Sequence, residues 1–488
     1  MIKRIITLCG LLMVFFSALF SQNAPDTLWT KTFGGSDYDE AYSVQQTTDL
    51  GYIFAGYTYS YGTGSNDVYL IKTNENGDSL WTKTFGGSGN DKSYSVQQTS
   101  DGGYIVTGYT SSYGAGQYDV YLIKTNENGD TLWTKSFGGT ATDRAFSVQQ
   151  TTDDGFIIVG DTESSGAGQY DVWLIKTDVN GDSLWTKTFG GSNYDFARSV
   201  KQTTDGGYII VGYTDLYGTG ENYILLIKTD MNGNTLWTKT FGGFNNDYRG
   251  YSVQQTIDGG YIVAGYSCFI AGFPNVYLIK TDGNGNEEWH KWFGGYFTDK
   301  GYSVQQTSDG GYIITGNTYD VINEDVYLIK TDENGDTLWT KTLGGVEGND
   351  CGTSVQQTTD GGYILVGNTW SYGIGFHNIW LIKIDTAITG IDYQVLLKLK
   401  SLNLGNYPNP FNSETKIQYS LPYKSNVELK IYNIKGQLVK KFLIDNNQSS
   451  IVWNGKNENG KQLSTGIYLY KLSIGNNKSI IKKMVLLR

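Results

Sequence analysis

The chain has 488 residues, of which 64 are glycine and 38 tyrosine, with three cysteines, two histidines and a formal net charge of −11. This wealth of aromatic residues excludes a disordered chain, and the lack of a Gly-X-Y period excludes collagen. The acidic balance argues against nucleic acid as a partner, and two histidines argue against a histidine-based metalloenzyme.

The first 21 residues have the features of a secretory signal peptide. Lys3 and Arg4 precede an uncharged run, Ile5–Phe20, and small or polar residues follow it. The alternative, a membrane anchor, would need about 18–20 apolar residues, and the run is shorter than that. We therefore expect residues 1–21 to be removed after Ser21, and no membrane-spanning segment in the mature chain.

Three signatures recur seven times after the signal peptide. A tryptophan followed by a basic strand and two glycines occurs at Trp29, Trp81, Trp133, Trp185, Trp237, Trp289 and Trp339. The motif S-V-(Q/K)-Q-T has its valine at Val44, Val96, Val148, Val200, Val253, Val304 and Val355. The motif L-I-K ends at Lys72, Lys124, Lys176, Lys228, Lys280, Lys330 and Lys383. The tryptophans recur every 52 residues, with one spacing of 50, and this regularity indicates a repeat architecture.

Each repeat predicts four short antiparallel strands, here named A, B, C and D. In the second repeat these are Tyr94–Thr99, Tyr104–Tyr109, Val120–Thr125 and Leu132–Phe137. Apolar and polar residues follow a period of two within each run, and Asp-Gly or Asn-Gly turns separate A from B and C from D. Seven such units predict an all-β, seven-bladed β-propeller over residues 22–385. The alternative is a β-solenoid, whose coils are usually shorter and need no internal hairpins.

The order of the strands favours a closed ring. The array begins with a D strand, Leu28–Phe33, and ends with a C strand, Ile379–Ile384. The N-terminal strand would complete the seventh blade and hide two sheet edges. Thr331–Trp339 also resembles the tryptophan-docking repeats of quinoprotein-type propellers, but this similarity extends only to architecture, and we expect no cofactor. Neither Cys268 nor Cys351 recurs between repeats, so we expect a fold that does not depend on a disulfide.

The two faces of the predicted ring differ. The A–B and C–D turns are nearly uniform, and we name their side the turn face. The D–A and B–C loops diverge, and their side, the loop face, is the candidate binding face because variable loops on a rigid scaffold usually carry recognition. Aromatic side chains in the B–C loops are candidates for contacting a glycan or protein, unless they pack on neighbouring blades: Tyr61, Tyr113, Tyr217, Trp370 and Tyr372.

An aspartate recurs just before each A strand. These residues are Asp39, Asp91, Asp143, Asp195, Asp247, Asp299 and Asp350. They could form a carboxylate ring for a hard cation such as Ca²⁺, or each could cap its own loop. We favour the caps, because a residue repeated seven times serves the repeated fold. No pair of carboxylates that breaks the repeat is singled out, so we expect no enzyme.

The composition changes after the repeats. Residues 386–404 form a connector, and residues 405–488 hold 13 Lys and Arg against four Asp and Glu, while the rest of the chain holds 24 against 44. Short strand-like runs in this basic segment predict a small Ig-like β-sandwich.

The motifs of the basic segment resemble one family closely. N-Y-P-N-P-F-N opens it at Asn406, W-N-G follows at Trp453, and the chain ends on K-M-V-L-L-R. This pattern resembles the type A C-terminal sorting domain of type IX secretion cargo; the motif residues are Pro408, Asn409, Pro410, Phe411, Gly466, Ile467, Tyr468 and Lys483. The resemblance implies recognition by the type IX machinery and delivery to the outer cell surface or the medium. The alternative is an ordinary adhesive Ig-like module.

Together these features predict an exported, monomeric propeller that binds a glycan or a protein. The alternatives are a secreted hydrolase or lyase on the same scaffold, and a purely structural surface protein.

Overall fold

The computed structural model describes residues 24–243, 246–269, 272–320, 322–386, 404–419, 427–444, 450–474 and 478–487. It divides into two compact units, Met1–Ala387 and Ile388–Arg488. The predicted signal peptide, 1–21, lies outside the described residues, as does the predicted connector, 386–404, except for its two end residues.

Seven four-stranded antiparallel sheets form the first unit, and six of them are built from consecutive strands. The first two sheets contain β2 (Asp39–Gln46), β3 (Tyr52–Thr58), β4 (Asp67–Thr73) and β5 (Ser79–Phe85), and then β6 (Asp91–Gln98), β7 (Tyr104–Thr110), β8 (Asp119–Thr125) and β9 (Thr131–Phe137). The third and fourth contain β10 (Asp143–Gln150), β11 (Phe156–Thr162), β12 (Asp171–Thr177) and β13 (Ser183–Phe189), and then β14 (Asp195–Gln202), β15 (Tyr208–Thr214), β16 (Tyr223–Thr229) and β17 (Thr235–Phe241). The fifth and sixth contain β18 (Asn246–Gln255), β19 (Tyr261–Phe269), β20 (Asn275–Thr281) and β21 (Glu287–Phe293), and then β22 (Asp299–Gln306), β23 (Tyr312–Tyr319), β24 (Glu324–Thr331) and β25 (Thr337–Leu343).

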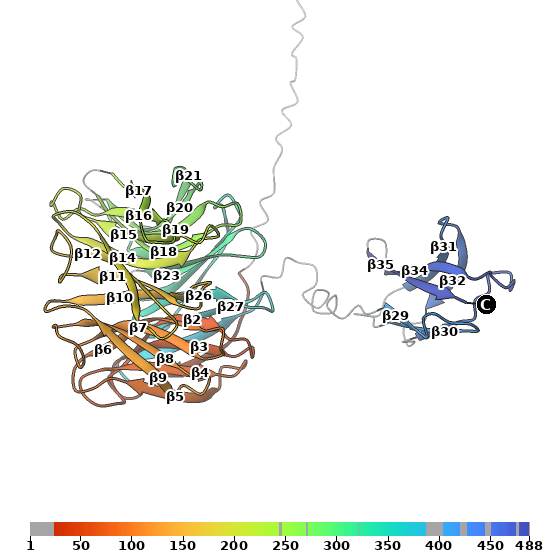
Figure 1. Ribbon diagram of the computed structural model, residues 1–488, viewed down its shortest axis with the longest axis horizontal. Coiled ribbons are helices and arrows are strands. Elements are labelled where there is room, and N and C mark those ends of the chain that lie inside the picture. Colours follow the sequence, from red (N-terminus) through yellow and green to blue (C-terminus); the bar gives the residue numbers. More distant parts are fainter. Residues whose placement is uncertain are drawn as a thin grey trace, which may run out of the picture. The chain divides into compact units, whose positions relative to one another are not determined.

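The seventh sheet closes the ring with a strand from the other end of the repeats. It contains β26 (Asp350–Gln357), β27 (Tyr363–Thr369), β28 (Asn378–Ile384) and, beside β28, the N-terminal strand β1 (Thr27–Phe33). The Asp385 N–H also donates to the Asp26 carbonyl at 2.9 Å. In Figure 1 the cyan strands β26 and β27 lie next to the red strand β2. The predicted seven-bladed propeller with N-terminal closure is therefore confirmed.

The repeated tryptophan of each blade packs against the next blade. The Trp81 ring of β5 lies 5.8 Å from the Tyr104 ring of β7, in the next blade, and Trp29 of β1 meets Tyr52 of β3 at 5.9 Å. The B and C strands are buried along almost their whole length because blades cover both of their faces, whereas the D strands alternate. The closing strand thus makes the same contact as an internal D strand.

The turn face is uniform because its signatures bond to one another. The L-I-K lysine Lys72, whose side chain is almost fully buried, pairs with Asp49 of the A–B turn at 2.9 Å and donates to the Thr73 carbonyl. The equivalent pair recurs in all seven blades, for example Lys228 with Asp205. These residues repeat because each holds its own hairpins together.

The innermost strand of every blade contains a β-bulge. In the first blade the pairing register shifts between Ala41 and Ser43, and the same shift occurs at the equivalent position of the other six blades. A bulge leaves one residue unpaired and breaks strict alternation. As a result Tyr42 and Ser43, although consecutive, both line the central passage.

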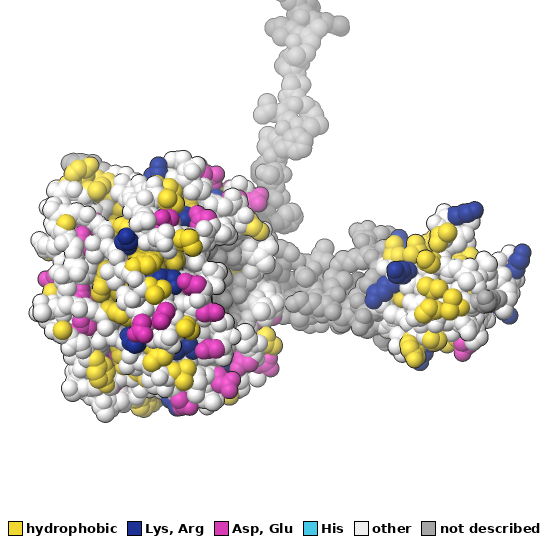
Figure 2. All heavy atoms as spheres, in the orientation of Figure 1, with side chains coloured by type: hydrophobic (Ala, Val, Ile, Leu, Met, Phe, Trp, Pro, Cys, Tyr) yellow, Lys and Arg dark blue, Asp and Glu magenta, His cyan; other side chains and the backbone are white. Residues whose placement is uncertain are grey.

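The C-terminal unit is a small sandwich of two sheets. One sheet has the order β29 (Leu404–Tyr407), β30 (Thr415–Tyr419), β33 (Ser450–Trp453); the other has the order β32 (Leu438–Ile444), β31 (Val427–Asn433), β34 (Gly466–Ile474), β35 (Lys478–Leu486). Trp453, Phe411 and Tyr470 are among its fully buried core residues. The predicted sandwich is confirmed, and in Figure 2 lysines and hydrophobic side chains share the visible face of this unit.

Candidate functional site

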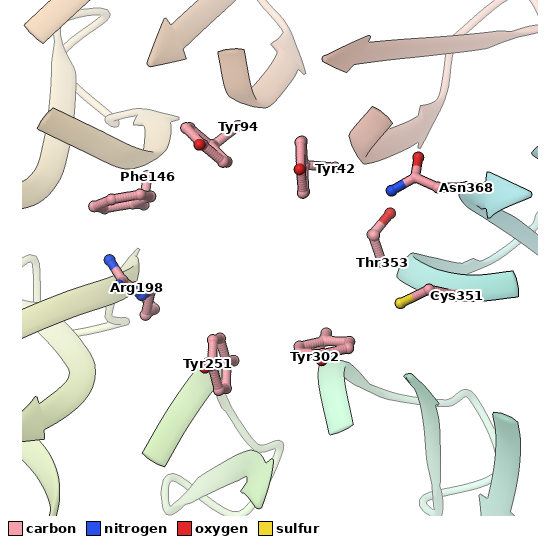
Figure 3. Close-up of a pocket in the computed structure, with 9 residues that line it drawn as sticks. All are labelled: Tyr42, Tyr94, Phe146, Arg198, Tyr251, Tyr302, Cys351, Thr353 and Asn368. Atoms are coloured by element: carbon pink, nitrogen blue, oxygen red, sulfur yellow. The ribbon is translucent and has the colours of Figure 1, made fainter. Parts of the chain in front are cut away.

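A pocket of about 470 Å³ occupies the centre of the ring. The bulged residue of each innermost strand contributes to it, which gives a ring of side chains: Tyr42, Tyr94, Phe146, Arg198, Tyr251, Tyr302 and Thr353. Figure 3 shows these side chains around one central space. We name this pocket the funnel. It lies near the D–A ends of the innermost strands, on the side of the loop face.

The aromatic rings of the funnel contact one another in tilted or T-shaped pairs. Tyr94 lies 4.8 Å from Tyr42 and 5.0 Å from Phe146, and Tyr251 meets Tyr302 at 5.3 Å in a T-shaped contact. Such contacts fix ring orientation. Burial holds the pKa of Tyr42 and of Tyr302 well above the ordinary tyrosine value, so these hydroxyls stay protonated and can donate hydrogen bonds.

Arg198 is the one charged side chain in the ring, and it is held in place on several sides. Its guanidinium donates to the Tyr213 hydroxyl at 2.8 Å and to Asp161 at 3.5 Å, and it lies 4.1 Å from the centre of the Phe146 ring. Asp161 is 0% exposed and also accepts from Arg144 at 3.0 Å. Two arginines share one buried carboxylate, so this side of the funnel is positively charged.

The seventh blade makes the funnel asymmetric. It places Thr353 at the bulge position, where the other six blades carry Tyr, Phe or Arg, and Cys351 and Asn368 line the pocket beside it. The Asn368 amide oxygen accepts from the Ala41 N–H at 2.9 Å, which leaves its amide nitrogen as a donor. Burial raises the pKa of Cys351, so its thiol stays protonated.

Further basic residues surround the funnel in a second tier, two residues before the bulge position. Lys92, Arg249 and Lys300 join Arg144 there; the Lys92 ammonium lies 3.6 Å from the centre of the Tyr57 ring. The acid in this tier is Glu40, which accepts from His377 at 3.1 Å. Burial raises the pKa of Glu40, but hydrogen bonds from His377 and tyrosines outweigh burial and lower it overall. Basic groups predominate around the funnel of an otherwise acidic unit.

The recurrent aspartates each hold a loop of their own blade. Asp143 accepts from the Gly139 N–H at 2.8 Å and the Ser164 hydroxyl at 2.6 Å, and Asp350 accepts from Gly345 at 3.0 Å. Equivalent bonds from a glycine N–H reach Asp39, Asp91, Asp195 and Asp299. Among the described residues no group of three or more acidic, histidine or cysteine side chains is placed to hold a metal ion. Loop capping therefore accounts for these six aspartates.

Asp247 occupies a different position in its strand from the other six aspartates. It pairs across the sheet with Cys268, while Tyr248 takes the position that aspartate has in the other blades. The fifth repeat has one extra residue between Asp247 and Val253, which moves the aspartate outward. Asp247 instead accepts from Asn222 at 2.7 Å and pairs with Arg249 at 3.1 Å.

The predicted B–C loop aromatics lie outside the funnel. The hydroxyl groups of Tyr61, Tyr113 and Tyr372 donate to carbonyls of Gly34, Gly86 and Gly344 in the D–A loops, at 2.8–3.0 Å. Each of these rings, and that of Tyr217, also packs on a C-strand aromatic. Trp370 lies 4.8 Å from His377. All five remain partly exposed on the loop face, but the structure does not bring them together in one site.

In the C-terminal unit the P-N-P-F motif holds the last strand. The Asn409 side chain accepts from the Val485 N–H at 2.9 Å and donates to the Lys483 carbonyl at 3.3 Å. The Phe411 backbone exchanges bonds with Val485 and Leu487, and its buried ring lies 5.6 Å from Trp453. Pro408 accepts from Thr415 at 2.8 Å.

The G-I-Y motif lies on the strand next to β35. Gly466 pairs with Leu486, Ile467 is half-exposed, and Tyr468 is buried with its hydroxyl donating to Ser464 at 2.9 Å. Lys483 is exposed. The motif residues thus fix the terminal strand and leave a basic side chain on its outer face.

Residues 406–487 match the family described as secretion system C-terminal sorting domain. The C-terminal unit is a type IX secretion sorting domain. The sorting domain directs the protein to the type IX machinery and to secretion at the outer cell surface, as predicted. Among the residues that the structure describes, no helix is long and apolar enough to cross a membrane.

Solved structures resemble the chain in fold. PorZ, a surface component of the type IX secretion system of Porphyromonas gingivalis, is 10% identical with a TM-score of 0.44; the similarity covers 93% of this chain and 60% of that one. The WD40 domain of Toxoplasma gondii coronin is 8% identical over 77% of this chain and 92% of that one, with a TM-score of 0.44.

One curated relative matches in sequence. The regulatory protein FlaEY of Caulobacter vibrioides is 26% identical over 181 residues, which is 31% of this chain and 19% of FlaEY. The matched region thus spans about a fifth of the length of that relative.

Proposed function

We propose that the propeller is a glycan-binding module that acts outside the cell, with the funnel as its site. The observation that carries this proposal is the ring of five aromatic side chains, with Arg198, around a pocket of about 470 Å³. Sugars present apolar C–H faces and hydroxyl edges, so a site for them combines flat rings with a few fixed polar groups. The funnel has both.

The charge around the funnel favours acidic glycans. Arg198 faces the pocket, and Lys92, Arg144, Arg249 and Lys300 lie in the tier around it. An arginine fork suits the planar carboxylate of a uronic acid or a sulfate group. A protein ligand remains the alternative, and the same basic groups would then select an acidic segment.

The chemistry of the funnel favours binding over catalysis. The residues that line the described pocket include no carboxylate. The nearest acids are already engaged, Glu40 by His377 and Asp161 by two arginines, whereas a glycosidase needs two available carboxyl groups. A lyase needs a base to remove a proton, and burial keeps the hydroxyls of Tyr42 and Tyr302 protonated.

A glycan array followed by calorimetry on the purified full-length protein tests the proposal. We expect acidic glycans to bind, and Tyr94→Ala and Tyr302→Ala each to weaken binding by about 5–30-fold, equivalent to roughly 1–2 kcal/mol for a lost stacking surface. Tyr296→Ala is the matched control, because this tyrosine is 92% exposed on the loop face outside the funnel. Loss of binding in Tyr217→Ala but not in the funnel variants would place the binding site on the exposed B–C loops and refute the funnel as the site.

A further inference from the structure

Beyond the funnel, the central passage narrows to a second pocket of about 230 Å³ lined by the S-V-(Q/K)-Q motifs. We name it the waist. Five blades line the waist with the serine, the valine and the first glutamine of the motif, the third blade lines it with Val148, and the fourth with Ser199 and Lys201, which stands in place of that glutamine. This substitution breaks the sevenfold repeat at the axis of the ring.

The first glutamine of each motif, which we call a waist glutamine, links its blade to a neighbouring blade through its amide oxygen. The Gln45 side chain accepts from the Gln98 N–H of the next blade at 2.6 Å, and Gln149 accepts from Gln202 at 2.8 Å. The other four junctions with a waist glutamine have the same bond. A backbone N–H can only donate, so these bonds fix which end of each amide carries oxygen. The amide nitrogens of the ring are therefore the groups left as donors.

Lys201 cannot make the link that its glutamine counterparts make. An ammonium has no acceptor, so at this junction the Gln255 N–H lacks the equivalent bond among the described residues. Lys201 forms no ion pair with any described carboxylate, and the residues that line the waist include no acid. Burial lowers the pKa of Lys201, as expected for a cation without a counter-charge.

We propose that the waist binds a small inorganic oxyanion, of the sulfate or phosphate class, against Lys201. A tetrahedral oxyanion offers several acceptors, and the waist offers one ammonium and the amide nitrogens of the glutamines that line it. Unpaired cations in a partly buried site are costly, and a bound anion relieves that cost. A volume of about 230 Å³ holds such an ion with several waters. This proposal does not depend on the glycan binding proposed for the funnel.

The test is calorimetric titration of the full-length protein with sodium sulfate, at constant ionic strength. We expect one saturable site per chain, and at least tenfold weaker binding in Lys201→Gln. The glutamine restores the missing acceptor, so this variant should also melt at the same or a higher temperature than the parent in the absence of sulfate. Lys201→Met lacks both the ammonium and the acceptor that Lys201→Gln introduces, so it should also bind sulfate at least tenfold more weakly, but without the gain in melting temperature.

Lys187→Gln is the matched control, because it removes a half-buried lysine on β13 that does not line the waist and bonds to Asn234. It should bind sulfate as the parent does. Equal sulfate binding by the parent and Lys201→Gln, or no saturable binding by the parent, would overturn the proposal. A melting temperature that rises with sulfate to the same extent in all variants would also overturn it, because general salting-out does not depend on one residue.

Discussion

Removal of β1 should open the ring. A chain that begins at Gly34 loses the partner of β28 and two partly buried rings, Trp29 and Phe33, which lie 5.9 Å from Tyr52 and 5.1 Å from Phe54. Each half-buried ring contributes about 2 kcal/mol and each hydrogen bond of the strand about 1 kcal/mol. The two rings account for about 4 kcal/mol and about one hydrogen bond at each of the six paired positions for about 6 kcal/mol, so the expected loss of roughly 10 kcal/mol is comparable to the whole stability of a typical domain. We expect aggregation, because the edge of β28 becomes unpaired and the rings of Tyr52 and Phe54 in the first blade lose their cover.

Point variants and a complementation assay make this prediction sharper. Trp29→Ala should cost about 2 kcal/mol, a fall in melting temperature of roughly 4 °C. Leu28→Ala, on the other face of the same strand and 51% exposed, should change stability by less than about 0.5 kcal/mol. A synthetic peptide spanning residues 25–33 should bind the truncated protein and raise its melting temperature. A truncated protein that stays monomeric and melts like the parent would refute the closed ring.

Two further predictions concern the loop caps and the sorting domain. Asp143→Ala should destabilise the propeller by about 1–2 kcal/mol, by analogy with other side-chain caps, while the control Glu333→Ala on the exposed C–D turn should leave stability unchanged. EDTA should leave the melting curve unchanged. A rise of many degrees in the melting temperature on addition of Ca²⁺ would contradict the cap. A chain that ends at Thr386 should fold but accumulate in the periplasm of a type IX-competent host, as measured by fractionation and immunoblotting against the full-length chain. Normal amounts of this truncated protein outside the cell would contradict the sorting assignment.

The repeats made most of the fold predictable. Asp-Gly and Asn-Gly turns at fixed offsets define hairpins, and a D strand at one end with a C strand at the other defines closure. The lysines of L-I-K and the aspartates of the A–B turns could be recognised as repeated, but their mutual pairing, as in Lys72 with Asp49, needed the structure. Repetition identifies residues that the fold requires without saying which contact each one makes.

The funnel could not be predicted because it depends on a bulge. Strict alternation would place Tyr42 and Ser43 on opposite faces of the strand, whereas the register shift turns both toward the axis. The exposed tyrosines of the B–C loops were easier to notice, but the hydroxyls of three of them are used to hold D–A loops. The displacement of Asp247 was visible in principle, since its distance to the next valine motif is six residues where other repeats have five.

Closure by β1 also determines the side of the ring at which the chain enters and leaves the propeller. Thr27 pairs with Ile384, and Ile384 lies opposite Tyr363, the first residue after an A–B turn. The described chain therefore enters and leaves the propeller at one corner of the turn face, while the funnel lies toward the loop face. Any tether attached through the residues that follow Thr386 would hold the ring by its invariant side. The funnel and the variable loops lie on the opposite side of the ring from this point of attachment.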